Sequence, residues 1–294
     1  MDRTTRLAIL GPPFLRNLKG VLATSQPIAI FDSGEGGLTV LKRAVALYPG
    51  EDFIYGADSV HFPYGSRSLE DVQRLFLRFL DFFLAEQVKA VVIACNTATA
   101  AALDVARRIS PVPVIGVVEP GARKAAAVSR NRHIAVLSTY ATYKSGVYLR
   151  AITASNQAAQ VVQHPCPALV TMAEAGATDT EQARMAVRAC LTTVFAYGVD
   201  TVVLGCTHFP HMERIFYEEI ANRAQIVDPG YETAKQLEDV LGPLNREPGG
   251  TLRFYTTGLP AEFNRIAAIL WPETPVQATP LIWLGGGYQT TRES

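Results

Sequence analysis

The pattern that most constrains the fold is a series of short apolar runs, rich in valine, isoleucine and alanine, which alternate with helix-length amphipathic segments. The runs are continuous, as in strands that are buried on both faces of a parallel sheet. They occupy residues 28–31, 90–94, 112–118, 134–137, 201–204 and 225–227. The amphipathic segments occupy residues 38–47, 69–86, 98–109, 180–197, 210–221 and 231–241. This alternation predicts an α/β fold of the doubly wound class.

Composition narrows the class of protein further. The chain has 294 residues, enough for about two domains at roughly 150 residues each. Basic and acidic residues both number 27, and this balance argues against a dedicated nucleic-acid-binding protein, which carries a basic excess. With 48% hydrophobic and only 18% charged residues, the chain is too apolar to be disordered. Its apolar runs fall short of the ~18 residues that a membrane span needs, so we expect no membrane segment.

The first 27 residues are interpreted as an extension in front of a domain that begins near Ile28. Their apolar stretch is interrupted after four residues by Gly11-Pro12-Pro13, and no A-x-A cleavage site follows. These features do not fit a secretory signal, so we expect a cytoplasmic protein.

Two segments resemble each other and place a cysteine after a strand. They are AVVIACNTATAAA, which contains Cys95, and DTVVLGCTHFPHM, which contains Cys206. The match favours two similar halves, each with a thiol at the carboxyl end of a strand, where open α/β sheets bind ligands. The alternative is that any two strand–helix units look alike over a dozen positions.

The four cysteines receive different interpretations. They contain no C-x-x-C pair, and a chain of this size needs no disulfides, so we expect all four to be reduced. Cys166 lies between two prolines in a segment poorly suited to open a helix, and Cys190 is interpreted as a small core residue within a helix. For Cys95 and Cys206, the amino end of the following helix is expected to lower the thiol pKa, which favours a catalytic role.

Other polar residues allow more than one interpretation. The glycine-rich turn after Phe31 has backbone N–H groups that suit an anion, and its Asp32 is either a helix cap or a carboxylate in a cleft. Cys206, His208 and His211 form a C-x-H-x-x-H pattern, a less favoured alternative for zinc because the spacing is not typical. His208 can instead assist the Cys206 thiol.

Taken together, these motifs are recognisable. The chain contains, in this order, FDSGEGGLTVLK, PYGSRS, VVIACNTATA, VPVIGVVEPGA, STYATYKSGVY, CPALV…EAG and VVLGCTHFPHM. It closely resembles glutamate racemases over residues 28–270. The resemblance implies a pyridoxal-independent isomerase without cofactor or metal, which interconverts L- and D-glutamate and supplies D-glutamate for peptidoglycan.

The resemblance also implies an architecture and a set of site residues. Two pseudo-symmetric, flavodoxin-like lobes are expected, residues 28–118 plus 229–294 and residues 119–228, with the active site in the cleft between them. Cys95 and Cys206 would be the catalytic acid/bases, assisted by Asp32 and His208. The implied substrate contacts are Asp32, Ser33, Pro63, Tyr64, Gly65, Asn96, Thr97, Thr139, Thr142, Glu174, Thr207 and His208.

The chain departs from the family pattern at three places. His61 occupies a variable position beside the cleft, the neighbours of Glu174 are altered, and Glu35 is unusual within FDSGEGG. The resemblance leaves open a homodimer, regulation by a cell-wall precursor through the extension, and an interaction with DNA gyrase. The rival functions are an aspartate racemase, a metal-dependent hydrolase and a bilobed binding protein.

Overall fold

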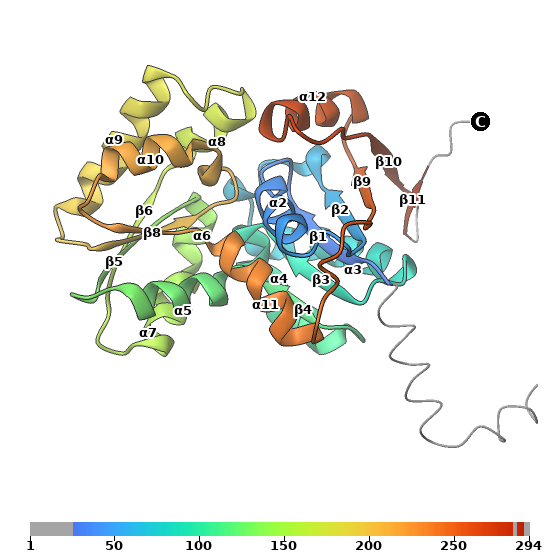
Figure 1. Cartoon of the computed structure of the whole chain (residues 1–294), viewed down its shortest axis with the longest axis horizontal. Helices are drawn as coiled ribbons and strands as arrows, with labels where there is room; N and C mark the ends of the chain where they lie inside the picture. Colours follow the sequence, from blue (N-terminus) through green and yellow to red (C-terminus); the bar gives the residue numbers. More distant parts are fainter. Residues whose placement is uncertain (1–25, 285–286, 291–294) are drawn as a thin grey trace, which may run out of the picture.

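The computed structural model describes residues 26–284 and 287–290, so the predicted extension lies almost wholly outside the described residues. Within that part of the chain, no helix is both long and apolar enough to cross a membrane. Two separate sheets, each covered by helices on both faces, make up the structure (Figure 1).

The larger sheet is built from both ends of the described chain. Its strand order is β11-β10-β9-β2-β1-β3-β4, parallel throughout except for β11, which pairs antiparallel with β10 at the edge. The strands are β1 (Ile28–Asp32), β2 (Phe53–Ala57), β3 (Ala90–Ile93), β4 (Val114–Gly116), β9 (Leu252–Thr256), β10 (Ala278–Trp283) and β11 (Tyr288–Thr290). One face packs on α3 (Leu69–Ala85) and α4 (Asn96–Ile109), and the other on α2 (Leu38–Leu47), α11 (Pro229–Leu241) and α12 (Pro260–Leu270).

The smaller sheet comes from the middle of the chain. Its order is β6-β5-β7-β8, all parallel, with β5 (His133–Ser138), β6 (Gln160–Pro165), β7 (Thr201–Gly205) and β8 (Gln225–Val227). One face packs on α5 (Val118–Val128) and α7 (Val147–Ser155). The other packs on α8 (Pro167–Glu174), α9 (Glu181–Phe195) and α10 (Glu213–Ile220), while α6 (Tyr140–Ser145) follows β5.

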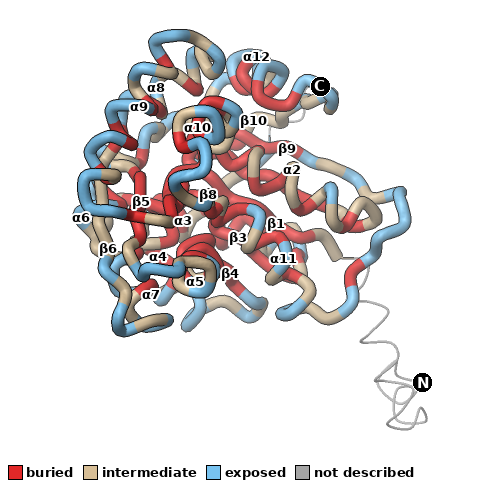
Figure 2. Tube along the Cα trace, turned by 60° about the vertical axis from the view of Figure 1, so that its left-hand side comes forward, coloured by how far each residue is buried: buried red, intermediate tan, exposed pale blue. Residues whose placement is uncertain are grey.

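The two sheets share one topology. If the first four strands of each are numbered along the chain, both have the order 2-1-3-4, which is the flavodoxin-like arrangement. Buried residues concentrate along these strands (Figure 2) because helices cover both faces. The predicted α/β fold with two doubly wound parallel-sheet lobes is confirmed, and the lobe boundaries given above stay a prediction.

The shared topology places the two cysteine motifs at corresponding positions. Cys95 follows β3 and Cys206 follows β7, each the third strand of its sheet. Both strands adjoin the first strand of their sheet, so each thiol lies beside the point where the strand order reverses. That point is where open α/β sheets bind ligands.

Candidate active site

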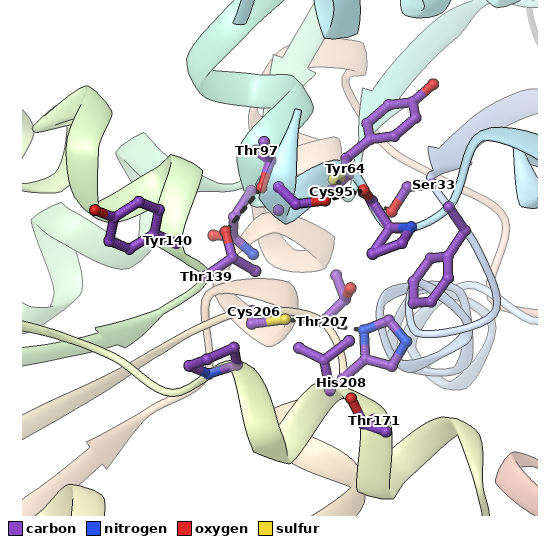
Figure 3. A pocket seen from close by; sticks show the side chains of 17 residues that line it. Ser33, Tyr64, Cys95, Thr97, Thr139, Tyr140, Thr171, Cys206, Thr207 and His208 are labelled. Atoms are coloured by element: carbon purple, nitrogen blue, oxygen red, sulfur yellow. Dashed lines mark hydrogen bonds between the residues drawn. The ribbon is translucent and has the colours of Figure 1, made fainter. Parts of the chain in front are cut away.

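A cavity of about 320 Å³ lies between the carboxyl ends of the strands of the two lobes (Figure 3). Its lining includes eleven of the residues expected from sequence: Ser33, Pro63, Tyr64, Gly65, Cys95, Asn96, Thr97, Thr139, Cys206, Thr207 and His208. Three further expected residues, Asp32, Thr142 and Glu174, are not in its wall and instead hydrogen-bond to residues that line it. Cys95 and Cys206 approach the cavity from opposite sides.

Cys95 caps the amino end of α4. Its buried sulfur accepts a hydrogen bond from the Ala98 amide at 3.4 Å and lies 3.7 Å from the Ser33 hydroxyl. The expected lowering of its pKa is wrong. Burial and the charge of Asp32 raise the Cys95 pKa to about 12, and these effects outweigh the Ala98 and Ser33 hydrogen bonds. Cys95 is therefore a thiol at neutral pH.

Asp32 supports Cys95 from behind the cavity wall. Its carboxylate accepts hydrogen bonds from the Thr207 hydroxyl at 3.1 Å and the Gly34 amide at 3.0 Å, and from the Ser33 hydroxyl at 3.4 Å. Because Ser33 also contacts the Cys95 sulfur, the three side chains form a chain from thiol to hydroxyl to carboxylate. Complete burial raises the pKa of Asp32 to about 6, and the positive charge of His208 limits the rise.

Cys206 has a different set of partners. Its sulfur lies 3.8 Å from Nδ1 of His208, and Nε2 of the same ring bonds to the Glu174 carboxylate. Burial lowers the pKa of His208, but the hydrogen bonds to Cys206 and Glu174 outweigh burial and raise it well above its ordinary value. Glu174 therefore orients a protonated imidazole against Cys206. Both ring nitrogens are occupied, which argues against the zinc alternative.

The segment after Cys206 differs from the expected helix. The predicted helix over residues 210–221 is divided into a 3₁₀ turn, η5 (Phe209–Met212), and α10, which starts only at Glu213. An α-helix therefore starts directly after Cys95 but not after Cys206. The two thiols are related by topology but not by local electrostatics.

Reciprocal contacts join the lobes at the site. From the larger lobe, Asn96 accepts a hydrogen bond from the Tyr148 hydroxyl at 2.6 Å. The Thr97 hydroxyl lies 3.0 Å from that of Thr139 and 3.1 Å from that of Thr142. From the smaller lobe, Thr207 reaches Asp32, as described above. Each cysteine motif is thus held by the opposite lobe through the residues that follow the thiol.

The glycine-rich turn after β1 packs directly on the histidine. A Cβ atom at Gly36 would lie 2.5 Å from Nδ1 of His208, and one at Gly37 would lie 2.5 Å from the Asp32 Cβ. Side chains at these positions would displace both residues. The glycines therefore allow the backbone of the turn to approach His208 and Asp32 closely.

Glu35, the unusual residue of this turn, is buried beside the same cluster. Its carboxylate accepts a hydrogen bond from Ser59 at 3.0 Å. Burial and the nearby charge of Glu174 raise the pKa of Glu35 to about 8. Sequence reasoning singled out Glu35 as a departure but assigned no role to it.

The Pro63-Tyr64-Gly65 loop lines part of the cavity. The Tyr64 hydroxyl is directed away from it and donates to Asp58 at 2.5 Å. His61 bonds to the same Asp58 at 2.9 Å and is not among the residues that line the cavity. The histidine therefore supports the loop that carries Tyr64.

Some lining residues were not among the site residues expected from the sequence. These are Phe62, Ser66, Tyr140 and, from α8, Pro167, Val170 and Thr171. The motif CPALV placed α8 in the family pattern, but apolar residues at helical spacing are indistinguishable from core residues without the fold.

The expectation of four reduced cysteines is wrong. Cys166 and Cys190 form a disulfide, with Cα atoms 6.4 Å apart, while Cys95 and Cys206 are free. Cys166 also caps α8, contrary to the expectation that its two prolines disfavour a helix start; Pro167 at the first helical position is a favoured residue. Cys190 faces inward from α9, which packs on β6, and this proximity is not visible in a separation of 24 residues.

Comparison with known proteins agrees with this geometry. The profile of the Asp/Glu/hydantoin racemase family matches residues 33–237. A glutamate racemase from Symbiobacterium thermophilum is 46% identical over 254 residues, covering 85% of this chain and 92% of that protein. A solved glutamate racemase isoform from Bacillus anthracis has a TM-score of 0.83 at 34% identity, covering 87% of this chain and 97% of that one. The structure from Francisella tularensis, in complex with D-glutamate, has a TM-score of 0.78 at 30% identity, with coverages of 87% and 96%. The chain belongs to the Asp/Glu/hydantoin racemase family.

Proposed function

We propose that this chain is a glutamate racemase that interconverts L- and D-glutamate with two cysteine thiols and no pyridoxal cofactor. The observation that carries the proposal is the pair of free, buried cysteines on opposite sides of one cavity, at corresponding strand ends of the two lobes. The relatives named above are glutamate racemases, which supports glutamate as the substrate.

Racemisation requires a base on one face of Cα and an acid on the other. From L-glutamate, the Cys206 thiolate takes the Cα proton and the electron pair of the C–H bond remains on the substrate. Cys95 then gives its thiol proton to the opposite face of Cα and becomes the thiolate. From D-glutamate the roles are exchanged.

His208 and Asp32 support these steps from opposite lobes. A protonated His208, 3.8 Å from the Cys206 sulfur, stabilises negative charge there before the proton is taken. Ser33 connects Cys95 to Asp32 and can hydrogen-bond the sulfur in either state. Both residues are positioning groups in this scheme, because each acts on the substrate through the thiol that it supports.

The cavity suits an anionic substrate, although none of the described residues that line it is lysine or arginine. The donors are hydroxyl groups of Ser33, Thr97, Thr139 and Thr207, the amide of Asn96, and backbone N–H groups at the start of α4. Preorganised neutral donors of this kind bind carboxylates and stabilise the charge that develops on the substrate.

The test is circular dichroism of the purified protein with D-glutamate, L-glutamate and D-aspartate. We expect loss of optical activity with both glutamate enantiomers, unchanged by chelators, and abolition in Cys95→Ser and Cys206→Ser. Decay of the circular dichroism signal with D-aspartate alone would change the assignment to an aspartate racemase. Loss of activity with EDTA and recovery with zinc would revive the metal-dependent alternative.

The physiological setting is part of the same proposal. We assign the D-glutamate product to peptidoglycan synthesis in the cytoplasm. The homodimer and the cell-wall-precursor regulator stay predictions, since the extension that would mediate regulation lies almost wholly outside the described residues.

A further inference from the structure

A second group of thiol and imidazole side chains lies in the smaller lobe, apart from the two catalytic cysteines. It consists of His164 on β6, Cys166 at the start of α8 and Cys190 on α9. One ring nitrogen and the two sulfurs all lie within 4.8 Å of one another. The two cysteines are buried in the apolar cluster between α8, α9 and the sheet, and His164 is half-buried.

The donor set has the chemistry of a site for zinc. Thiolate and imidazole are the ligands that Zn²⁺ prefers in proteins. With zinc–ligand bonds of about 2.0–2.3 Å, tetrahedral ligand atoms lie about 3.3–3.8 Å apart, a separation that fits within the observed group. Because His164 is half-buried, solvent can supply a fourth ligand.

The disulfide alone does not account for the histidine. Cys166 and Cys190 need only each other to form the S–S bond, yet His164 directs a nitrogen to the same place. Within the described part of the chain, no hydrogen bond fixes the ring of His164 there, whereas His61, His133 and His208 each hydrogen-bond to a defined acceptor. His164 and Cys166 lie two positions apart between the end of β6 and the start of α8, and the fold brings Cys190 of α9 to them.

We propose that His164, Cys166 and Cys190 form a zinc site when the cysteines are reduced, and that zinc and the disulfide are alternative occupants of the same two sulfurs. An added dithiol reduces the S–S bond, which gives two thiols and the oxidised dithiol. The two thiols then bind Zn²⁺ as thiolates and release two protons. A disulfide such as oxidised glutathione accepts the two electrons in the reverse direction after the metal has left.

Both the disulfide and the zinc ion would hold α8 in place. Cys166 caps α8, whose Val170 and Thr171 line the cavity and whose last residue, Glu174, holds His208. Either link joins the start of that helix to α9. Zinc would therefore keep α8 anchored under reducing conditions, in which the disulfide is lost. This inference concerns a site outside the racemase chemistry and does not depend on the proposed activity.

The experiment is a titration of the full-length protein with Zn²⁺, followed by a zinc-sensitive dye, and with Co²⁺, followed by its sulfur-to-metal charge-transfer absorption. The parent for the comparison is Cys95→Ser/Cys206→Ser, which removes the two catalytic thiols as competing ligands. In this parent, we expect one metal equivalent after reduction and none after oxidation. Zinc should also raise the melting temperature of the reduced parent, because it binds the folded state.

Two variants in the same parent identify the ligands. Cys190→Ser should abolish the charge-transfer band typical of two thiolates, and His164→Gln should weaken zinc affinity by at least about tenfold. His164 is half-buried, so its variant keeps the test valid if Cys190→Ser fails to fold. The proposal is overturned if the reduced parent binds no zinc, if the oxidised parent binds it equally well, or if His164→Gln binds with unchanged affinity.

Discussion

Replacement of Glu35 by glutamine should stabilise the protein, although it removes a side chain that is well packed. Glu35 is buried beside Glu174, and its pKa is raised from 4.5 to about 8. The Oε1 atom of glutamine can still accept the hydrogen bond that Ser59 donates at 3.0 Å. The substitution therefore removes the titration and preserves the local contact.

The magnitude follows from proton linkage. The folded state retains the Glu35 proton more tightly than the unfolded state, so the unfolded chain releases it first as the pH rises above 4.5. The free energy of unfolding therefore falls between pH 4.5 and about 8, and the loss is complete above the folded pKa. At 1.36 kcal/mol per pKa unit, the loss is below about 1 kcal/mol at pH 5 and about 3 kcal/mol at pH 7.

The assay is urea unfolding of wild type and Glu35→Gln at pH 5, 6 and 7. The stability advantage of the variant should grow by about 2–3 kcal/mol from pH 5 to pH 7. Glu70→Gln is the matched control, because Glu70 is exposed in the first turn of α3. A difference between wild type and Glu35→Gln that stays constant over this range would refute the reasoning, whatever its sign.

Three further predictions concern the reaction. Gly36→Ala should lower kcat at least about tenfold without unfolding the protein, because its methyl group would displace the His208 ring; wild-type kcat in a circular dichroism assay would contradict this. In D₂O, L-glutamate should give D-glutamate labelled at Cα, since the donor thiol exchanges with solvent; unlabelled product at initial rates would indicate one shared base. His208→Ala should lower kcat/KM equally in both directions, by about 10²-fold, because the equilibrium constant is one. Compared with the wild type, His208→Ala should show a larger Cα deuterium isotope effect with L-glutamate and a smaller one with D-glutamate. Asp32→Asn should show the opposite pattern. Identical patterns in the two variants would mean that His208 and Asp32 do not serve separate thiols.

Most of the strands that sequence reasoning found are buried on both faces. The exceptions are β8, a partly exposed edge strand that was found, and β2, a fully buried strand that was missed. Residues 28–31, 134–137 and 201–204 coincide with the cores of β1, β5 and β7, where helices cover both sides. β6 was missed because it is an edge strand whose residues are mostly half-buried, so its sequence has no continuous apolar run. α5 was missed because Pro120 and Gly121 interrupt its pattern, although a proline is tolerated in the first turn of a helix.

Whether a site residue could be predicted also depends on how much of its placement is local in the sequence. Residues that lie next to a strand end, such as Cys95 and Thr207, could be predicted because the strand and its connection are local in sequence. The placement of Glu174 came only from the family resemblance, and Thr171 was missed, because α8 reaches the cavity through tertiary packing. The pKa of Cys95 was predicted in the wrong direction. A helix end is visible in the sequence, whereas the burial and the Asp32 charge that outweigh it are not.

The related topology of the lobes and the unequal surroundings of the thiols fit together in one mechanism. The fold brings both cysteines to the cavity from corresponding strand ends, as a reaction at two faces of one carbon requires. Their neighbours differ: Asp32 and burial keep Cys95 protonated, while a protonated His208 adjoins Cys206. In the proposed scheme, each turnover of L-glutamate leaves the two thiols in the opposite protonation state. Because the enantiomers have equal free energies, the unequal surroundings of the thiols cannot alter the equilibrium. A second turnover in the same direction requires that the two thiols exchange protonation states, through solvent or through the hydroxyl and imidazole groups that line the cavity.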